Sequence, residues 1–127
     1  MTSNNRHNVG PRVLLLAYSC NPRGGSELGL GWNRALQAAK FFPTWVICDD
    51  DDNRADIEKY LAKHGPIANL TFVYVKSAKW TKRLRRLPGM FYPSYNLWHR
   101  TAFKVARELH QRIGFDVVHQ LNLCGFR

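Results

Sequence analysis

The sequence has 127 residues, enough for one domain with a hydrophobic core but too few for two. Its 45% apolar and 22% charged residues are typical of an ordinary globular protein, and no apolar run is long enough to span a membrane. Nineteen Lys and Arg residues against nine Asp and Glu residues give a net charge of +10. That charge indicates an anionic partner, such as a phosphorylated ligand, acidic lipid or nucleic acid.

The three cysteines, Cys20, Cys48 and Cys124, are far apart and form no Cys-x-x-Cys pair. This spacing argues against both a zinc site and a disulfide framework, and it favours reduced thiols. The alternative is a signal peptide in which Cys20 is a lipid-modified cysteine.

The first predicted element is a strand over Val13–Tyr18, an apolar run that indicates burial on both faces. A turn rich in Asn, Pro and Gly follows over 21–25, and Ser26 stands at the N-cap of a helix that runs to about Lys40. A strand, a glycine turn and a helix in this order are typical of the first half of a βαβ unit.

The chain continues with the same alternation of apolar runs and helical periodicity. The remaining predicted elements are a strand over Thr44–Cys48, a helix over Arg54–Lys63 capped by Asn53, a strand over Leu70–Val75, a short basic helix around Trp80–Leu87, a long helix over Tyr95–Ile113 and a strand over Phe115–His119.

This order predicts an α/β fold with a doubly wound parallel sheet, because each connection is long enough for a right-handed crossover. The expected strand order is 3-2-1-4, with residues 1–11 as a disordered leader and 12–127 as a partial Rossmann-like domain. The switch point then lies between the first and fourth strands. It brings the turn with Gly24 and Gly25 next to the loop that carries His119 and Asn122.

The glycine turn is the first candidate site. Gly24 and Gly25 lack a Cβ atom, so the backbone can approach a ligand closely, and the helix that starts at Ser26 and Glu27 offers N–H donors to a phosphate. The alternative is that the two glycines only make a tight turn.

Gly29 and Gly31 superficially match a dinucleotide fingerprint, with Asp49 about twenty residues further on. Both glycines fall inside the predicted helix instead of opening it. We expect them to let the helix pack closely on the sheet, so the nicotinamide interpretation is weak.

His119 is either a buried core histidine or a ligand contact at the switch point. The Asp49–Asp52 run indicates a solvated loop that caps the helix over Arg54–Lys63 and not a metal site, because four successive carboxylates cannot all face one ion. The basic segment, Lys76–Arg86, is either a solvated loop or a helix that contacts an anionic partner. Its Trp and Leu residues favour an anionic membrane over nucleic acid as that partner. Its candidate contacts are Lys79, Trp80, Lys82, Arg83, Arg85 and Arg86.

The sequence resembles the N-terminal domain of retaining glycosyltransferases of the GT-B fold, family 4 or "group 1". Two stretches carry the resemblance, RVLLLAYSCNPRGGSELGLGW from Arg12 and LWHRTAFKVARELHQRIGFDVVHQLNLCGFR from Leu97. The resemblance implies two Rossmann-like domains, of which the N-terminal one mainly holds the acceptor and the other the nucleotide-sugar donor. It also implies transfer with retention, without a metal or cofactor.

By the same resemblance, Gly24, Gly25 and Ser26 lie against the donor diphosphate, with Glu27 in the first turn of the helix. His119 contacts the donor sugar and is the candidate catalytic residue, and Asn122 helps to shape the pocket. The acceptor is expected to be a glycan or lipid-linked sugar in cell-surface polysaccharide synthesis, on the cytoplasmic side of the membrane.

The sequence stops before the donor domain of that family, so we expect these 127 residues alone to be inactive. Two alternatives stay open. One is a non-catalytic module that binds an anionic membrane or nucleic acid, and the other is a fragment of a nicotinamide-dependent oxidoreductase.

Overall fold

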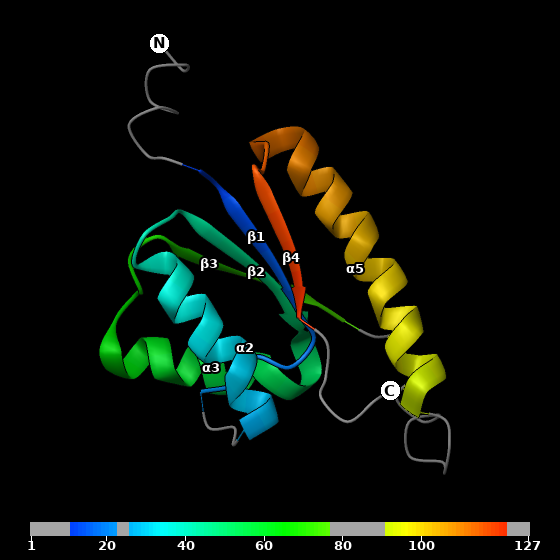
Figure 1. Cartoon of the computed structure of the whole chain (residues 1–127). Coiled ribbons are helices and arrows are strands. Elements are labelled where there is room, and N and C mark those ends of the chain that lie inside the picture. Colours follow the sequence, from blue (N-terminus) through cyan, green and yellow to red (C-terminus); the bar gives the residue numbers. More distant parts are fainter. Residues whose placement is uncertain (1–10, 23–25, 77–90, 122–127) are drawn as a thin grey trace.

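The computed structural model describes residues 11–22, 26–76 and 91–121, which form four strands and three helices (Figure 1). In chain order these are β1 (Val13–Ala17), α2 (Ser26–Ala39), β2 (Thr44–Asp49), α3 (Asp50–His64), β3 (Leu70–Val75), α5 (Phe91–Ile113) and β4 (Val117–Leu121).

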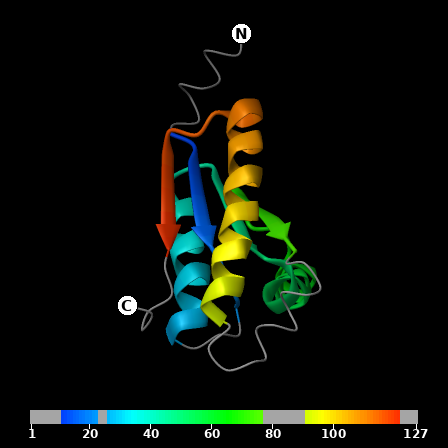
Figure 2. The ribbon, with the colours of Figure 1, turned by 90° about the vertical axis from the view of Figure 1, so that its right-hand side faces the viewer.

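The strands form one parallel sheet in the order β3-β2-β1-β4, which confirms the predicted topology. α2 and α3 cover one face, and α5 crosses the other face (Figure 2). The chain therefore has a Rossmann-like α/β fold whose switch point lies between β1 and β4.

One half of the core lies between the sheet and α5. It contains Leu14 and Leu16 of β1 and the row Trp98, Ala102 and Leu109 of α5. The Trp98 indole packs edge-on against the ring of Tyr18, with centroids 4.9 Å apart, and donates a hydrogen bond to the Val75 carbonyl at 3.0 Å. Trp98 thus ties α5 to the ends of two strands.

The other half of the core lies under α2 and α3. Trp32 stacks on Phe72 at 5.7 Å and meets Tyr60 edge-on at 4.9 Å. Close packing of α2 on β1 depends on Gly31, because a Cβ there would stand 2.3 Å from the Ser19 carbonyl oxygen. The predicted packing role of Gly31 is confirmed.

Three predicted boundaries are wrong by several residues. α3 begins at Asp50, so Asn53 is not its N-cap. Acidic residues at 50–52 stabilise this helix start, because the N-terminal end of a helix carries a partial positive charge. α5 begins at Phe91, four residues before Tyr95, because proline is tolerated in a first helical turn.

The last strand is Val117–Leu121 and not Phe115–His119. Phe115 instead enters the core against Trp45, with ring centroids 5.4 Å apart. Arg12 helps to set the register of β4 on β1, because its carbonyl accepts hydrogen bonds from the amides of Asp116 and Val117 at 2.9 and 3.2 Å.

Candidate functional site

The candidate site lies where β1 and β2 end side by side. The Asp49 amide donates a hydrogen bond to the Tyr18 carbonyl at 3.1 Å, so the segments that continue β1 and β2 are still paired at this end of the sheet. Open α/β sheets bind their ligands at this edge. The segment after Tyr18 leads to the predicted glycine turn.

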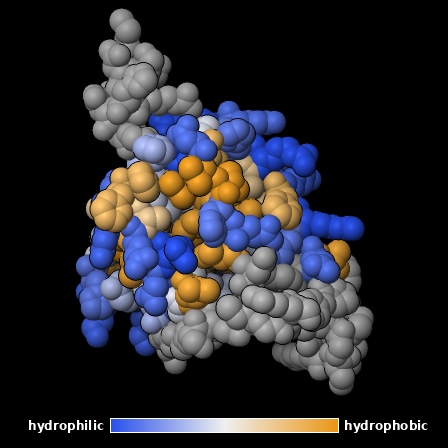
Figure 3. Space-filling model, viewed as in Figure 1, coloured by the Kyte–Doolittle hydropathy of each residue, from blue (hydrophilic) through white to orange (hydrophobic). Residues whose placement is uncertain are grey.

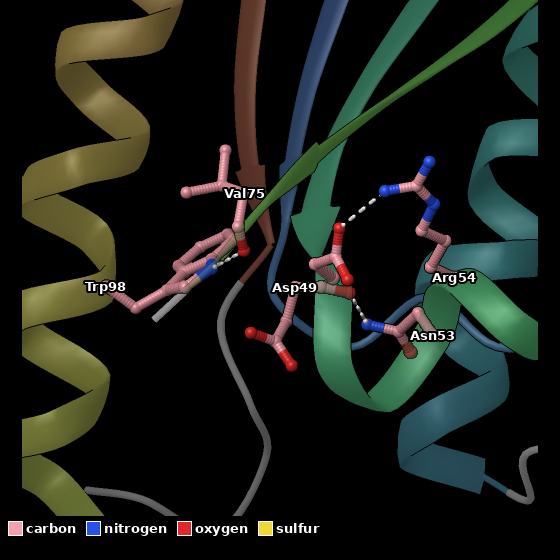
Figure 4. Close-up of polar contacts among 6 residues, drawn as sticks. Asp49, Asn53, Arg54, Val75 and Trp98 are labelled. Atoms are coloured by element: carbon pink, nitrogen blue, oxygen red, sulfur yellow. Dashed lines mark hydrogen bonds and ion pairs between the residues drawn. The ribbon is translucent and has the colours of Figure 1, made fainter. Parts of the chain in front are cut away.

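Asn53 of α3 fixes the start of this segment. Its amide nitrogen lies 2.9 Å from both the Tyr18 and the Asp49 carbonyl oxygens, and its Oδ1 accepts from the Cys20 amide at 3.2 Å. The side chain is fully buried, and Figure 4 shows it turned back toward the end of β2. One side chain therefore accepts from the Cys20 amide and adds a donor to the Tyr18 and Asp49 carbonyls.

Asn21 adds a second tie to the same helix. Its side-chain amide donates to the Asp56 carboxylate at 2.8 Å. Together with Asn53, this bond holds the β1–α2 segment against the first turns of α3. The chain therefore enters the glycine turn from a fixed position.

Asp49 places a fully buried carboxylate at the end of β2. Figure 4 shows this carboxylate on the side that faces Trp98, away from Arg54. Arg54 pairs instead with Asp50 at 3.1 Å and lies over the Tyr74 ring at 5.2 Å from its centroid. Burial raises the pKa of the Tyr74 hydroxyl, so this group stays protonated near neutral pH.

His99 follows Trp98 on α5 and is also buried. Its ring lies against those of Trp98 and Phe103, with centroids 5.0 and 5.9 Å away. Burial lowers the pKa of His99, because the ring is removed from the water that would stabilise its charged form. The neutral imidazole is therefore the form that the fold favours.

Cys20 and Cys48 are buried, and neither forms a disulfide. A hydrogen bond with Cys20, together with burial, raises the pKa of the Cys48 thiol. Thiols held in the protonated form are poor nucleophiles. Cys48 therefore fits the core and not a nucleophilic role, and Cys20 is buried in the same core cluster.

His119 lies within β4, two residues before its end, and is exposed. It is in register with Leu15, and Leu121 is in register with Ala17. Leu15, Ala17 and Leu121 all contribute to the core on the α2 side. Side chains alternate along a strand, so His119 faces the same side as α2, at whose start Ser26 and Glu27 stand.

The other predicted site residues lie outside the described residues. These are Gly24, Gly25 and Asn122 of the glycine turn and the last loop, and Lys79, Trp80, Lys82, Arg83, Arg85 and Arg86 of the basic segment. Their roles, and the short basic helix expected around 80–87, stay predictions.

The sequence analysis missed Asn53 as the residue that fixes the loop. The available signal was its position four residues after Asp49, in the first turns of a helix that follows a buried strand. Within residues 11–22, 26–76 and 91–121, no three His, Cys, Asp or Glu side chains gather as metal ligands, and no helix is both long and apolar enough to cross a membrane.

Comparisons with known proteins found no family model, no curated protein and no solved structure that matches this chain. The resemblance to family 4 glycosyltransferases therefore stays a prediction from sequence motifs. The fold and the geometry at the ends of β1 and β2 rest on the structure itself.

Proposed function

We propose that this chain is the acceptor-side, N-terminal part of a retaining nucleotide-sugar glycosyltransferase. The observation that carries the proposal is the strand order, with β1 next to β4 at the switch point. The turn that follows β1 and the loop that follows β4 leave this same edge of the sheet. Both belong to the stretches on which the resemblance rests.

In this proposal the backbone N–H groups of Gly24 and Gly25 bind the donor diphosphate. The dipole of α2 supports that charge from Ser26 onward. Asn53 acts as a positioning residue, because it holds the segment before the turn and does not itself contact the ligand. His119 donates a hydrogen bond to the donor sugar, and Asn122 helps to shape the pocket.

The test uses the chain labelled with nitrogen-15 and titrated with inorganic pyrophosphate and then with a panel of nucleoside diphosphate sugars. We expect chemical-shift changes at the amides of residues 24–27. Gly25→Val should abolish them, because a branched side chain then stands where the phosphate must approach. His119→Ala should weaken sugar-dependent changes and leave those caused by pyrophosphate unaltered.

The matched control for His119→Ala is His64→Ala, which removes an exposed histidine at the end of α3. Shift changes that appear only around residues 79–86, and equally with any anion, would favour the anionic-surface alternative. Unperturbed amides at 24–27 with every diphosphate would contradict the proposal. In a protein that also contains the donor half, we expect His119→Ala to lower turnover by about 10²–10³.

A further inference from the structure

The helices on the two faces of the sheet carry charges of opposite sign. With histidine counted as neutral, α3 contains five acidic and three basic residues and has a net charge of −2. α2 contains one residue of each sign. α5, on the other face, contains four basic residues and one acidic residue and has a net charge of +3. The positive charge of these three helices is therefore concentrated on the side of the sheet that α5 covers (Figure 2).

Three of the basic residues of α5 form a row on its outer side. Arg100, Lys104 and Arg107 are four and three residues apart, which places them along one line of a helix. All three are exposed, whereas Ala102 and Leu109 on the opposite side of α5 are buried against the sheet. Figure 3, the same view as Figure 1, shows hydrophilic surface along the right-hand side of the molecule, where α5 lies.

The exposure of this row does not depend on whether the sheet continues beyond β4. In an α/β domain the helices form the outer layers, and a further strand lengthens the sheet between them. Such a strand would lie beside β4 and would not cover the outer side of α5.

The acidic residues in and after α5 offset only part of this charge. Glu108 stands four residues after Lys104 and four before the exposed Arg112, so it lies between two cations. The exposed Asp116 follows the helix, and its carboxylate accepts a hydrogen bond from the Arg12 amide at 2.9 Å. Four cations therefore stand against two carboxylates in α5 and the connection that follows it.

An exposed aromatic ring stands beside the row of cations. Phe103, directly before Lys104 in the chain, is 44% exposed and lies on the same side of α5 as His99 and His110. His110 accepts a hydrogen bond through Nδ1 from the Phe115 amide at 3.0 Å, just before the chain enters β4, so this side of α5 faces β4. Basic side chains beside an exposed aromatic ring are typical of surfaces that contact lipid headgroups. A nucleic-acid backbone would bind the cations but would offer the ring no apolar contact.

We propose that the outer side of α5 binds the surface of an anionic membrane. Arg100, Lys104 and Arg107 lie against the phosphates of acidic lipids, and the ring of Phe103 enters the layer of headgroups. The negative charge of α3 is repelled by the same surface and turns that side of the molecule away. A second copy of the chain is disfavoured as the occupant, because it would bring the same cations. This inference goes beyond the proposed function and uses neither the glycine turn nor the diphosphate site.

The test measures how the whole chain partitions onto vesicles of phosphatidylcholine mixed with phosphatidylglycerol. Vesicles of phosphatidylcholine alone are the uncharged comparison. We expect binding to the anionic vesicles only, and added salt should weaken it, because ions screen the attraction. A lipid with a paramagnetic headgroup should broaden the amide signals of residues 100–107 and leave those of α3 sharp.

Two triple variants remove the same charge from opposite faces of the sheet. Each cation at an anionic surface contributes about fivefold in affinity, so the variant of the row on α5 should bind roughly 100-fold more weakly. The matched control changes three exposed cations of α2 and α3 and should bind less than about threefold more weakly, because these positions lie on the far side of the sheet and are screened. Glutamine, lysine and arginine have similar helix propensities, so the thermal unfolding midpoint should stay close to that of the parent chain. The substitutions are Arg100→Gln, Lys104→Gln and Arg107→Gln in the first variant and Arg34→Gln, Lys59→Gln and Lys63→Gln in the control.

A single substitution tests the apolar contact. Phe103→Ala should weaken binding to the anionic vesicles by about threefold to tenfold, because the ring no longer leaves water. Its affinity for a DNA duplex of mixed sequence should equal that of the parent chain. The control is Phe41→Ala, at a position that is 75% exposed in the connection between α2 and β2, and it should leave vesicle binding unchanged.

Equal losses in the two triple variants would overturn the proposal, because the cations of α5 would then act through net charge alone. A parent chain that does not bind the anionic vesicles would overturn it as well. Tight binding to the DNA duplex, with vesicle binding that Phe103→Ala leaves unaltered, would assign this surface to nucleic acid instead. A loss of vesicle binding that is confined to the α5 variants supports the proposal.

Discussion

β1 and β4 lie side by side and pair over five residues, yet their surroundings differ completely. Every residue of β1 is buried, whereas the first four residues of β4 are exposed. β1 has strands on both sides, α2 above one face and α5 above the other. β4 has one neighbouring strand among the described residues, and none of its residues belongs to the core cluster beneath α5.

This difference shows that burial follows from position in the sheet and not from the apolar character of the strand. Val117 and Val118 are as β-prone as any residue of β1. A central parallel strand must be apolar on both faces, because helices cover both. At the edge of the described sheet the same residue types stay exposed.

The largest expected effect contrasts a core position in β1 with a surface position in β4. Leu16 is 1% exposed and packs in the cluster beneath α5, so Leu16→Ala should lower the free energy of unfolding by about 2–5 kcal/mol. Val118→Ala should change it by no more than about 0.5 kcal/mol. Urea unfolding followed by tryptophan fluorescence measures both values. Similar losses in the two variants would show that β4 is covered in solution.

The fold could be predicted because its determinants are local and repeated. Each of the first three apolar runs is followed by a helical pattern, and right-handed crossovers leave few strand orders for such an alternation. The error at β4 has a physical cause that the pattern does not contain. Phe115 is apolar and adjacent to the strand, but its ring packs against Trp45 in the core. A local pattern cannot distinguish an apolar residue that begins a strand from one that packs into the core just before the strand.

The candidate site was less predictable, because its key contacts join residues far apart in the chain. Asn53 looks like a helix cap in the sequence, since asparagine is favoured at that position. Besides the nearby Asp49 carbonyl, its partners are Tyr18 and Cys20, which are more than thirty residues away. The carboxyl end of β1 is thus fixed by a tertiary contact that composition and periodicity do not reveal.

The next prediction tests whether Asn53 holds the end of β1. Asn53→Ala removes three hydrogen bonds, among them the one that the buried Cys20 amide donates, so the free energy of unfolding should fall by about 2–3 kcal/mol. Hydrogen exchange at the Cys20 amide should accelerate in the same variant. The control is Arg54→Ala at the next position, where loss of one surface ion pair should cost less than about 1 kcal/mol. If Arg54→Ala costs as much, the effect belongs to the helix and not to the end of β1.

The smallest expected effect concerns His99, a buried histidine on the side of α5 that faces β4. Burial lowers its pKa below the ordinary value of 6.5, so the unfolded chain binds more protons than the folded chain as the pH falls through this value. His99 therefore contributes full stability above about pH 6.5, and that contribution decreases toward lower pH. One proton at most is involved, so the slope of the unfolding free energy against pH cannot exceed about 1.4 kcal/mol per pH unit.

Urea unfolding between pH 5 and 7.5 should show a shallower pH dependence for His99→Gln than for the parent chain. Thr101→Ala, an exposed position on the same helix, changes no titratable group and serves as the control. The same pH dependence in all three proteins would mean that the His99 ring is hydrated in solution, and the uncovered region would then extend from β4 across this side of α5.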